Sequence, residues 1–238
     1  MSKEIPHEAQ LGAPVPAGPQ PAWLRPRAPV TCSPWSMTGS PFTLRYPRVV
    51  TADRDDEPPR WHVYGERTLY DSPWVRLVRV DVEPPDGNRF EHHVIRLQRV
   101  VMALALREEG SEVLMLRRHR FVTDQIGWEL PGGIVESGDG SEESAARETE
   151  EETGYRPTEP GRKLIEFQPM VGMVDTPHEV WVFDQVERVG DPTDAVEAGV
   201  VGWVPLGEVT GMIDRGEILG GGSITGLLRY LVAHPAGS

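Results

Sequence analysis

Residues 132–155, GGIVESGDGSEESAARETEEETGY, carry eight carboxylate side chains and a single arginine, Arg147. Glu148, Glu151 and Glu152 follow the i, i+3, i+4 spacing that places side chains on one face of a helix. Like charges at that spacing repel, so neutralising one of them is expected to leave the fold intact or slightly more stable. Arg147 can compensate only part of this charge. Carboxylates converging from one face are ligands for Mg²⁺ or Mn²⁺, so the spacing predicts a divalent-cation site.

The residues before these glutamates predict a tight loop, because a proline stands directly ahead of a Gly-Gly pair. The helix is expected to run roughly over 140–153, with Asp139 or Ser141 as its N-terminal cap and Gly154 at its end. On the carboxylates alone, the alternative interpretation is an ordinary solvated helix face that binds no ligand.

The chain from about residue 61 alternates between strand and helix patterns. Residues 74–97 predict two strands joined by a Pro-Pro-Asp-Gly-Asn turn, and the run VVMALAL at 100–106 predicts a strand buried on both faces. Further strands are expected at 112–121, 163–170, 178–186 and 200–206, and two short closing helices at 207–216 and 223–234. Ser223 is expected to cap the second of these helices. Strands around a few helices indicate an α+β or layered α/β domain.

Composition limits the partners that the chain can bind. The 238 residues carry a formal net charge of −13 with a pI near 5.0. Phosphate backbones and anionic membranes both require a concentrated Lys/Arg surface, so neither nucleic acid nor a membrane is an expected partner. The lone cysteine, Cys32, excludes an intramolecular disulfide, and no secretory or membrane-spanning pattern is present, which makes the cytoplasm the expected compartment.

The first 60 residues differ from the rest in composition. They hold roughly half of the 23 prolines and follow neither the helix nor the strand period. We therefore expect a proline-rich, mobile arm over 1–60 and a single domain over 61–238. Within that domain, 61–98 would form N-terminal strands and 99–238 the catalytic fold.

The glycine-rich loop and the helix together resemble the Nudix box of the Nudix hydrolases. That pattern is a glycine, five residues, an acid, seven residues, and then Arg-Glu-x-x-Glu-Glu-x-Gly. The matching residues are Gly133, Asp139, Arg147, Glu148, Glu151, Glu152 and Gly154. Asp139 replaces the family's usual Glu, and Thr149 replaces an aliphatic residue, so its hydroxyl needs a hydrogen-bond partner if it is buried.

The resemblance implies an α/β Nudix fold, an α/β/α sandwich with a mixed sheet, here preceded by a small N-terminal antiparallel sheet. It implies metal-dependent hydrolysis of the pyrophosphate bond of a nucleoside diphosphate linked to another moiety. Glu148, Glu151 and Glu152 would hold Mg²⁺ or Mn²⁺ with the carbonyl of Gly132, and Arg147 would orient them. The cation would neutralise the phosphates and lower the pKa of the water that attacks phosphorus.

Segments outside the box resemble the ADP-ribose pyrophosphatase branch of the family. By that resemblance Arg120 would contact the substrate's phosphates, and Trp128 and Glu129 of the matching GWELPGG segment would contribute to substrate binding. Asp175, in the loop GMVDTPHEV, is placed to line the mouth of the pocket. The alternatives are a solvated strand end for Arg120 and ordinary loop polarity for Asp175. The resemblance also implies a homodimer formed through the N-terminal strands. The proline that marks ADP-ribose specificity is missing, because Val171 stands at its position. The expected substrate is therefore ADP-ribose or a related nucleotide sugar.

The same branch carries two acids on a loop ahead of the GVVGWVPL segment. Only the second is present, as Glu197, and Ala195 stands in place of the first. Glu197 is expected to act as the general base or as a further metal ligand, although a box glutamate or metal-bound hydroxide could replace the missing base. The alternative function is a Nudix module that senses a nucleotide without cutting it. The retained carboxylates favour an enzyme, a Nudix pyrophosphohydrolase.

Overall fold

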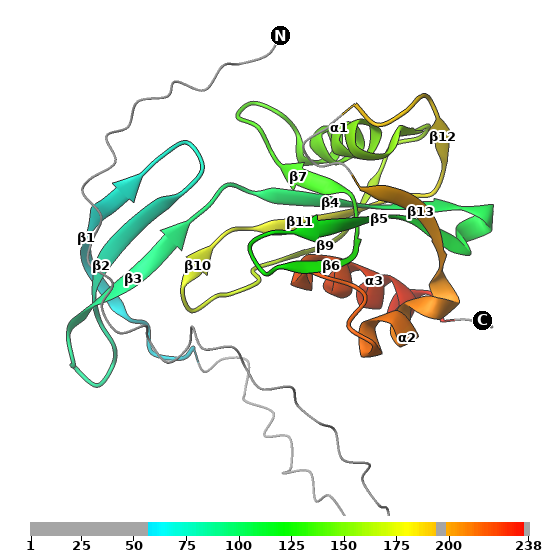
Figure 1. The fold of residues 1–238 in the computed structure, drawn as a ribbon. Coiled ribbons are helices and arrows are strands. Elements are labelled where there is room, and N and C mark those ends of the chain that lie inside the picture. The colour runs from blue at the N-terminus through cyan, green and yellow to red at the C-terminus, as the bar shows by residue number, and fades with distance from the viewer. Residues whose placement is uncertain (1–56, 194–198, 236–238) are drawn as a thin grey trace, which may run out of the picture. The chain divides into compact units, whose positions relative to one another are not determined.

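A mixed sheet organises the part of the chain that the computed structural model describes, residues 57–193 and 199–235. Its strand order is β13-β5-β4-β11-β9, with β6 paired to β5 and β7 paired to β4 (Figure 1). The strands are β4 (Val100–Arg107), β5 (Glu112–Arg120), β6 (Gln125–Glu129), β7 (Gly132–Ile134), β9 (Arg162–Phe167), β11 (His178–Phe183) and β13 (Val200–Pro205). β4 and β11 run parallel, whereas the other pairs are antiparallel.

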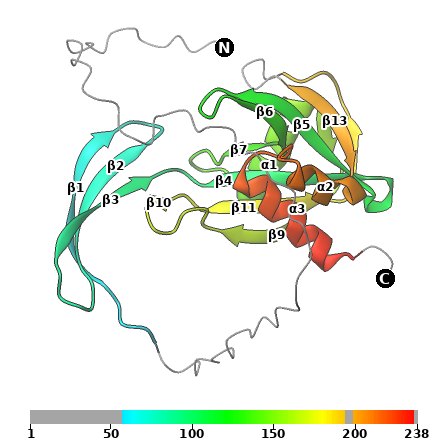
Figure 2. The ribbon, with the colours of Figure 1, turned by 60° about the horizontal axis from the view of Figure 1, so that its bottom comes forward.

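Helices cover both faces of this sheet. α1 (Ser141–Thr153) lies on one face, and α2 (Val209–Asp214) and α3 (Gly221–Ala233) lie on the other (Figures 1 and 2). Alternate residues of β4 explain this arrangement, because they point to opposite faces of the sheet and join different hydrophobic clusters. Leu104 belongs to the cluster that includes Leu227 of α3, and Ala103 belongs to the cluster that includes Ala145 of α1. The predicted α/β/α sandwich and the strand buried on both faces are confirmed. Within the described residues, no helix is long and apolar enough to span a bilayer.

A second, smaller sheet precedes the sandwich. Its order is β1-β2-β3-β10, with β10 added parallel to β3 (Figure 1). Its strands are β1 (His62–Asp71), β2 (Arg76–Glu83), β3 (Phe90–Arg96) and β10 (Val174–Asp175). β2 and β3 confirm the predicted hairpin, whereas the sequence missed β1, because all ten of its residues are exposed and no burial pattern marks it. Residues 1–56 of the expected arm lie outside the described residues.

Short elements complete the described chain. A two-stranded ladder joins β8 (Tyr155–Pro157) to β12 (Val186–Arg188), and 3₁₀ turns span Glu108–Gly110 and Leu206–Glu208. The N-terminal caps predicted for α1 and α3 are wrong. α1 is capped by Gly140, and α3 is capped by Gly220, while Ser223 instead accepts a hydrogen bond from the Leu130 amide at 3.0 Å. The predicted end of α1 is confirmed, because Gly154 adopts the left-handed conformation at φ 74°.

Candidate active site

The three box glutamates of α1 border one pocket of about 660 Å³. The glycines of β7 form part of its wall, and Arg147, Gln98 and Trp74 also line it. The helix face and the glycine-rich loop therefore meet at one place, as the sequence pattern predicted.

Arg147 is shared between two of these carboxylates. Its Nη1 lies 2.8 Å from Glu151 Oε2, and its Nη2 lies 2.9 Å from Glu148 Oε1. Helical spacing predicts that Arg147 reaches Glu143 and Glu151, one turn away on either side, and the contact with Glu151 is confirmed. Glu143 turns instead toward the start of the helix, where it accepts a 3.4 Å hydrogen bond from the Gly140 amide. Arg147 thus holds Glu148 and Glu151 side by side at the pocket, which is the geometry that an orienting residue requires.

The third carboxylate is buried and paired with an arginine that the sequence analysis missed. Glu152 is 3% exposed and Arg118, on β5, is 5% exposed. Glu152 Oε1 lies 2.5 Å from Arg118 Nη1, and Glu152 Oε2 accepts a 2.9 Å hydrogen bond from the Gly132 amide. Burial raises the pKa of the Glu152 carboxyl, and Arg118 and the Gly132 amide act against that rise. Arg118 therefore supplies a second positive charge, which neutralises the Glu152 carboxylate that Arg147 does not pair with.

Arg118 also links α1 to two of the residues predicted to bind substrate. Glu129 Oε2 accepts hydrogen bonds from Arg118 Nε at 2.9 Å and from Arg120 Nε at 2.8 Å. These three side chains line a second cavity of about 220 Å³ at the start of α3. Gly132 borders both this cavity and the glutamate pocket, so Arg120 and Glu129 lie on the other side of Gly132 from the box glutamates.

The other predicted residues lie elsewhere. The Trp128 ring packs against Gly202 and the core on the α2–α3 face. Asp175, on β10, forms a 2.9 Å ion pair with Arg96 and borders a separate apolar pocket beside the small sheet. Neither is among the described residues that line the two cavities at Gly132. Glu197 and Ala195 fall in 194–198, outside the described residues.

Backbone packing explains the Gly-Gly pair. A Cβ on Gly132 would lie 2.1 Å from the Val101 carbonyl oxygen, and a Cβ on Gly133 would lie 2.6–2.7 Å from the Glu148 carboxylate atoms. Because the clash at Gly132 is with backbone, only glycine at this position lets β7 approach β4 this closely, whereas a side chain at 133 would displace the end of Glu148. The buried Thr149 hydroxyl, the other departure from the family pattern, donates a 2.7 Å hydrogen bond to the Ala145 carbonyl.

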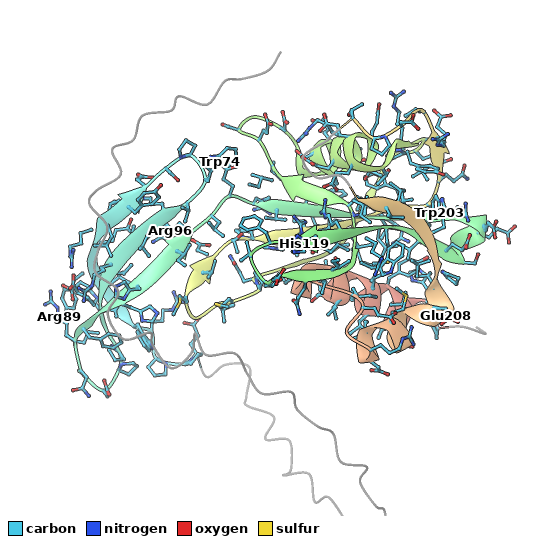
Figure 3. All side chains as sticks on the ribbon, in the orientation of Figure 1. Trp74, Arg89, Arg96, His119, Trp203 and Glu208 are labelled. Atoms are coloured by element: carbon cyan, nitrogen blue, oxygen red, sulfur yellow. The ribbon has the colours of Figure 1, made fainter. Side chains whose placement is uncertain are left out.

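An exposed tryptophan completes the rim of the glutamate pocket. Trp74 projects from the loop between β1 and β2 and is 71% exposed (Figure 3). The neighbouring backbone is fixed, because Gln98 Nε2 donates a 2.9 Å hydrogen bond to the Pro73 carbonyl. A large aromatic face beside a polar pocket suits the stacking of a planar ring. The sequence analysis missed this role, because it placed Trp74 at the start of a strand and did not predict β1 before it.

The donor set suits a hard divalent cation, since carboxylate and backbone carbonyl oxygens are the ligands that Mg²⁺ and Mn²⁺ prefer. Among the residues that the structure describes, however, no three His, Cys, Asp or Glu side chains already converge as a metal centre. The arginine contacts give the physical reason, because Arg147 and Arg118 draw the three carboxylates toward themselves.

Comparisons with known proteins agree with this geometry. A model of the NUDIX domain matches residues 96–219. A CMP-5'-(N-acetyl-N-hydroxy-3-aminopropyl)phosphonate hydrolase from Streptomyces rubellomurinus is 42% identical over 172 residues, 72% of this chain and 82% of that protein. An ADP-ribose pyrophosphatase from Mycobacterium tuberculosis is 27% identical over 167 residues, 69% of this chain and 80% of that protein. The crystal structure of an ADP compounds hydrolase has the same fold, with a TM-score of 0.66 and 16% identity over 76% of this chain and 98% of that chain. The chain therefore belongs to the Nudix hydrolase family, as the residues of its loop and helix predicted.

Proposed function

We propose that this protein uses a divalent cation to hydrolyse the phosphoanhydride bond of a nucleoside diphosphate derivative. One observation carries the proposal: three carboxylates from one face of α1 border a pocket that the Gly-Gly backbone of β7 also lines. Membership in a hydrolase family supports the same reaction class. The alternative, a Nudix module that binds a nucleotide without cutting it, is not favoured, because Glu148, Glu151 and Glu152 are all retained.

Each residue of the pocket would have a distinct role in this reaction. Glu148 and Glu151, with the Gly132 carbonyl and the predicted third ligand Glu152, would hold Mg²⁺ or Mn²⁺. When bound, the cation neutralises phosphate oxygens and lowers the pKa of the attacking water. Arg147 keeps the first two carboxylates directed at the pocket.

Arg120, which lines the cavity on the other side of Gly132, would bind the phosphates of the substrate. Glu197, predicted as the general base or as a further metal ligand, lies outside the described residues, and its role stays a prediction.

Two substrate classes are supported. ADP-ribose, or a related nucleotide sugar, follows from the similarity to ADP-ribose pyrophosphatases. A nucleotide-linked phosphonate is the second candidate, and the observation that favours it is the 42% identity to a hydrolase of a CMP-linked phosphonate. Incubation with ADP-ribose, with other nucleoside diphosphate sugars and with a CMP-linked phosphonate, each with Mg²⁺ and with nucleoside monophosphate as the measured product, separates these candidates. Binding without any product would support the sensing module instead.

Trp74→Ala is expected to weaken substrate binding and to leave the chemical step nearly unchanged. Stacking of a base on an aromatic ring is worth roughly 1–3 kcal/mol, so KM should rise roughly 5–150-fold. Steady-state kinetics with the best substrate of the panel test this, with Trp74→Phe as the matched control that keeps a ring. An unchanged KM in the alanine variant would remove Trp74 from the site.

Gly133→Ala is expected to lower turnover while the fold survives. The added Cβ meets the flexible end of Glu148, so that carboxylate must move rather than the backbone. A misplacement of about 1 Å at a catalytic group costs on the order of 10²-fold in rate. The control is Gly207→Ala, because a Cβ at Gly207 would meet nothing within 4 Å. Equal turnover of the two variants would contradict the assignment of Glu148.

We further infer that the small sheet pairs with a second copy of the chain. Large apolar side chains stand exposed on or beside β1 and β3, among them Trp61 at 54%, Tyr70 at 56% and Phe90 at 43%. The Trp61 and Phe90 rings lie 5.9 Å apart between centroids, and adjoining exposed aromatic side chains of this kind mark an interaction surface. Sedimentation velocity is expected to show a dimer for the wild type and a shift toward monomer for Phe90→Glu. A monomeric wild type at micromolar concentration would refute this inference.

A further inference from the structure

We propose that Arg118 and a divalent cation compete for Glu152, so that the cation can use this carboxylate only when the buried ion pair opens. This inference rests on the proposed metal-dependent function. It makes Arg118 a positioning residue, which acts on the site through Glu152.

Both oxygens of Glu152 are engaged by partners inside the protein. Oε1 lies 2.5 Å from Arg118 Nη1, and Oε2 accepts the Gly132 amide at 2.9 Å. A cation that coordinated Oε1 would lie no more than about 4.6 Å from Nη1, because the metal–oxygen distance for Mg²⁺ is about 2.1 Å. Two positive charges at such a separation repel strongly in a buried setting, where water does not screen them. Each of the two therefore weakens the hold of the other on Oε1.

The Arg147 pairs differ from this one in exposure. The side chains of Arg147 and Glu151 are 34% and 42% exposed, whereas those of Arg118 and Glu152 are 4% and 1% exposed. Exposed ion pairs contribute little and rearrange readily, because water replaces the lost partner. A buried pair holds its partners far more strongly. The resistance to cation binding is thus concentrated at Glu152.

Arg118 keeps a carboxylate partner, Glu129, when its ion pair with Glu152 opens. Its Nε donates to Glu129 at 2.9 Å, a contact that does not involve Glu152. The 220 Å³ cavity that Arg118 and Arg120 line adjoins the guanidinium. A tilt of the whole planar guanidinium about its Glu129 contact would move Nη1 away from Glu152, and Glu129 would still balance the buried charge of Arg118.

The test measures Mn²⁺ affinity directly, by calorimetric titration of the full chain with Mn²⁺ alone. Arg118→Gln is expected to bind Mn²⁺ more tightly by at least about fivefold, the lower end of typical coupling between two sites. The matched control is Arg117→Gln, one residue away on β5, exposed and directed to the opposite face. It should bind Mn²⁺ as the wild type does. A purely structural Arg118 would change the melting temperature but not the Mn²⁺ affinity.

A second variant keeps the test decisive if Arg118→Gln does not fold. Arg118→Lys retains the charge but loses the planar guanidinium, and its Mn²⁺ affinity should fall between those of the wild type and the glutamine variant. Wild-type affinity in every folded variant at position 118 would overturn the proposal. A wild type that neither binds Mn²⁺ nor needs it for turnover would remove the proposed function, and this inference with it.

Discussion

Replacing Glu152 with Gln is expected to lower the free energy of unfolding by roughly 3–5 kcal/mol, the typical cost of removing one partner of a buried ion pair. The reason is that the Arg118 guanidinium, 5% exposed, loses one of its carboxylate partners while it stays buried. Urea unfolding monitored by circular dichroism measures this loss.

The matched control for this prediction is Glu150→Gln. Glu150 lies on the same helix but pairs with Arg156 at the surface, so its replacement should change stability little. Wild-type stability of Glu152→Gln would contradict the buried pair. From the helical spacing alone, Glu152→Gln would be expected to leave stability unchanged or slightly higher, because it relieves repulsion between like charges. The structure reverses that expectation, because Glu152 is paired with Arg118 of β5 and with the Gly132 amide of β7.

Glu148→Gln and Glu151→Gln are expected to reduce turnover by roughly 10²–10⁴-fold, because a catalytic cation contributes several kcal/mol and each 1.4 kcal/mol is tenfold in rate. Both carboxylates border the pocket and are held by the same arginine. Initial rates over a range of Mg²⁺ concentrations measure the loss. Stability should change far less in Glu151→Gln than in Glu152→Gln, because the Glu151 side chain is 42% exposed.

Glu143→Gln serves as the control for these two variants. Glu143 stands on the first turn of α1 and bonds the Gly140 amide, so its replacement removes a helix carboxylate without touching the pocket. Its rate should match the wild type. Wild-type rates in both Glu148→Gln and Glu151→Gln would show that the pocket is not the catalytic site.

Local spacing explains what could be predicted from the sequence. The helix, its end at Gly154 and the grouping of three glutamates all follow from contacts within a few residues. The need of Thr149 for a hydrogen-bond partner is equally local, and the Ala145 carbonyl one turn earlier meets it. The sandwich follows from strands of recognisable pattern around a few helices.

Contacts between distant elements could not be read in the same way. The Arg118–Glu152 pair joins residues 34 positions apart, and it depends on how β5 and α1 are placed across the sheet. The run of basic residues at 117–120 does not say which side chain faces the helix. Trp74 reaches the glutamate pocket only because the small sheet brings its β1–β2 loop there. Trp128 lies next to the recognised glycine-rich motif in the sequence, yet its ring packs against the hydrophobic core and not toward the glutamate pocket.

The most direct test of the proposed reaction is ³¹P NMR of the full chain with ADP-ribose and with a CMP-linked phosphonate, first in Mg²⁺ and then in excess EDTA. At least one substrate is expected to lose its phosphoanhydride resonances and to gain those of a nucleoside monophosphate and a second phosphorus product. EDTA or the Glu148→Gln substitution is expected to stop this conversion. Intact substrates in Mg²⁺, or conversion that continues at the same rate in EDTA, would contradict a metal-dependent hydrolase built on the α1 glutamates.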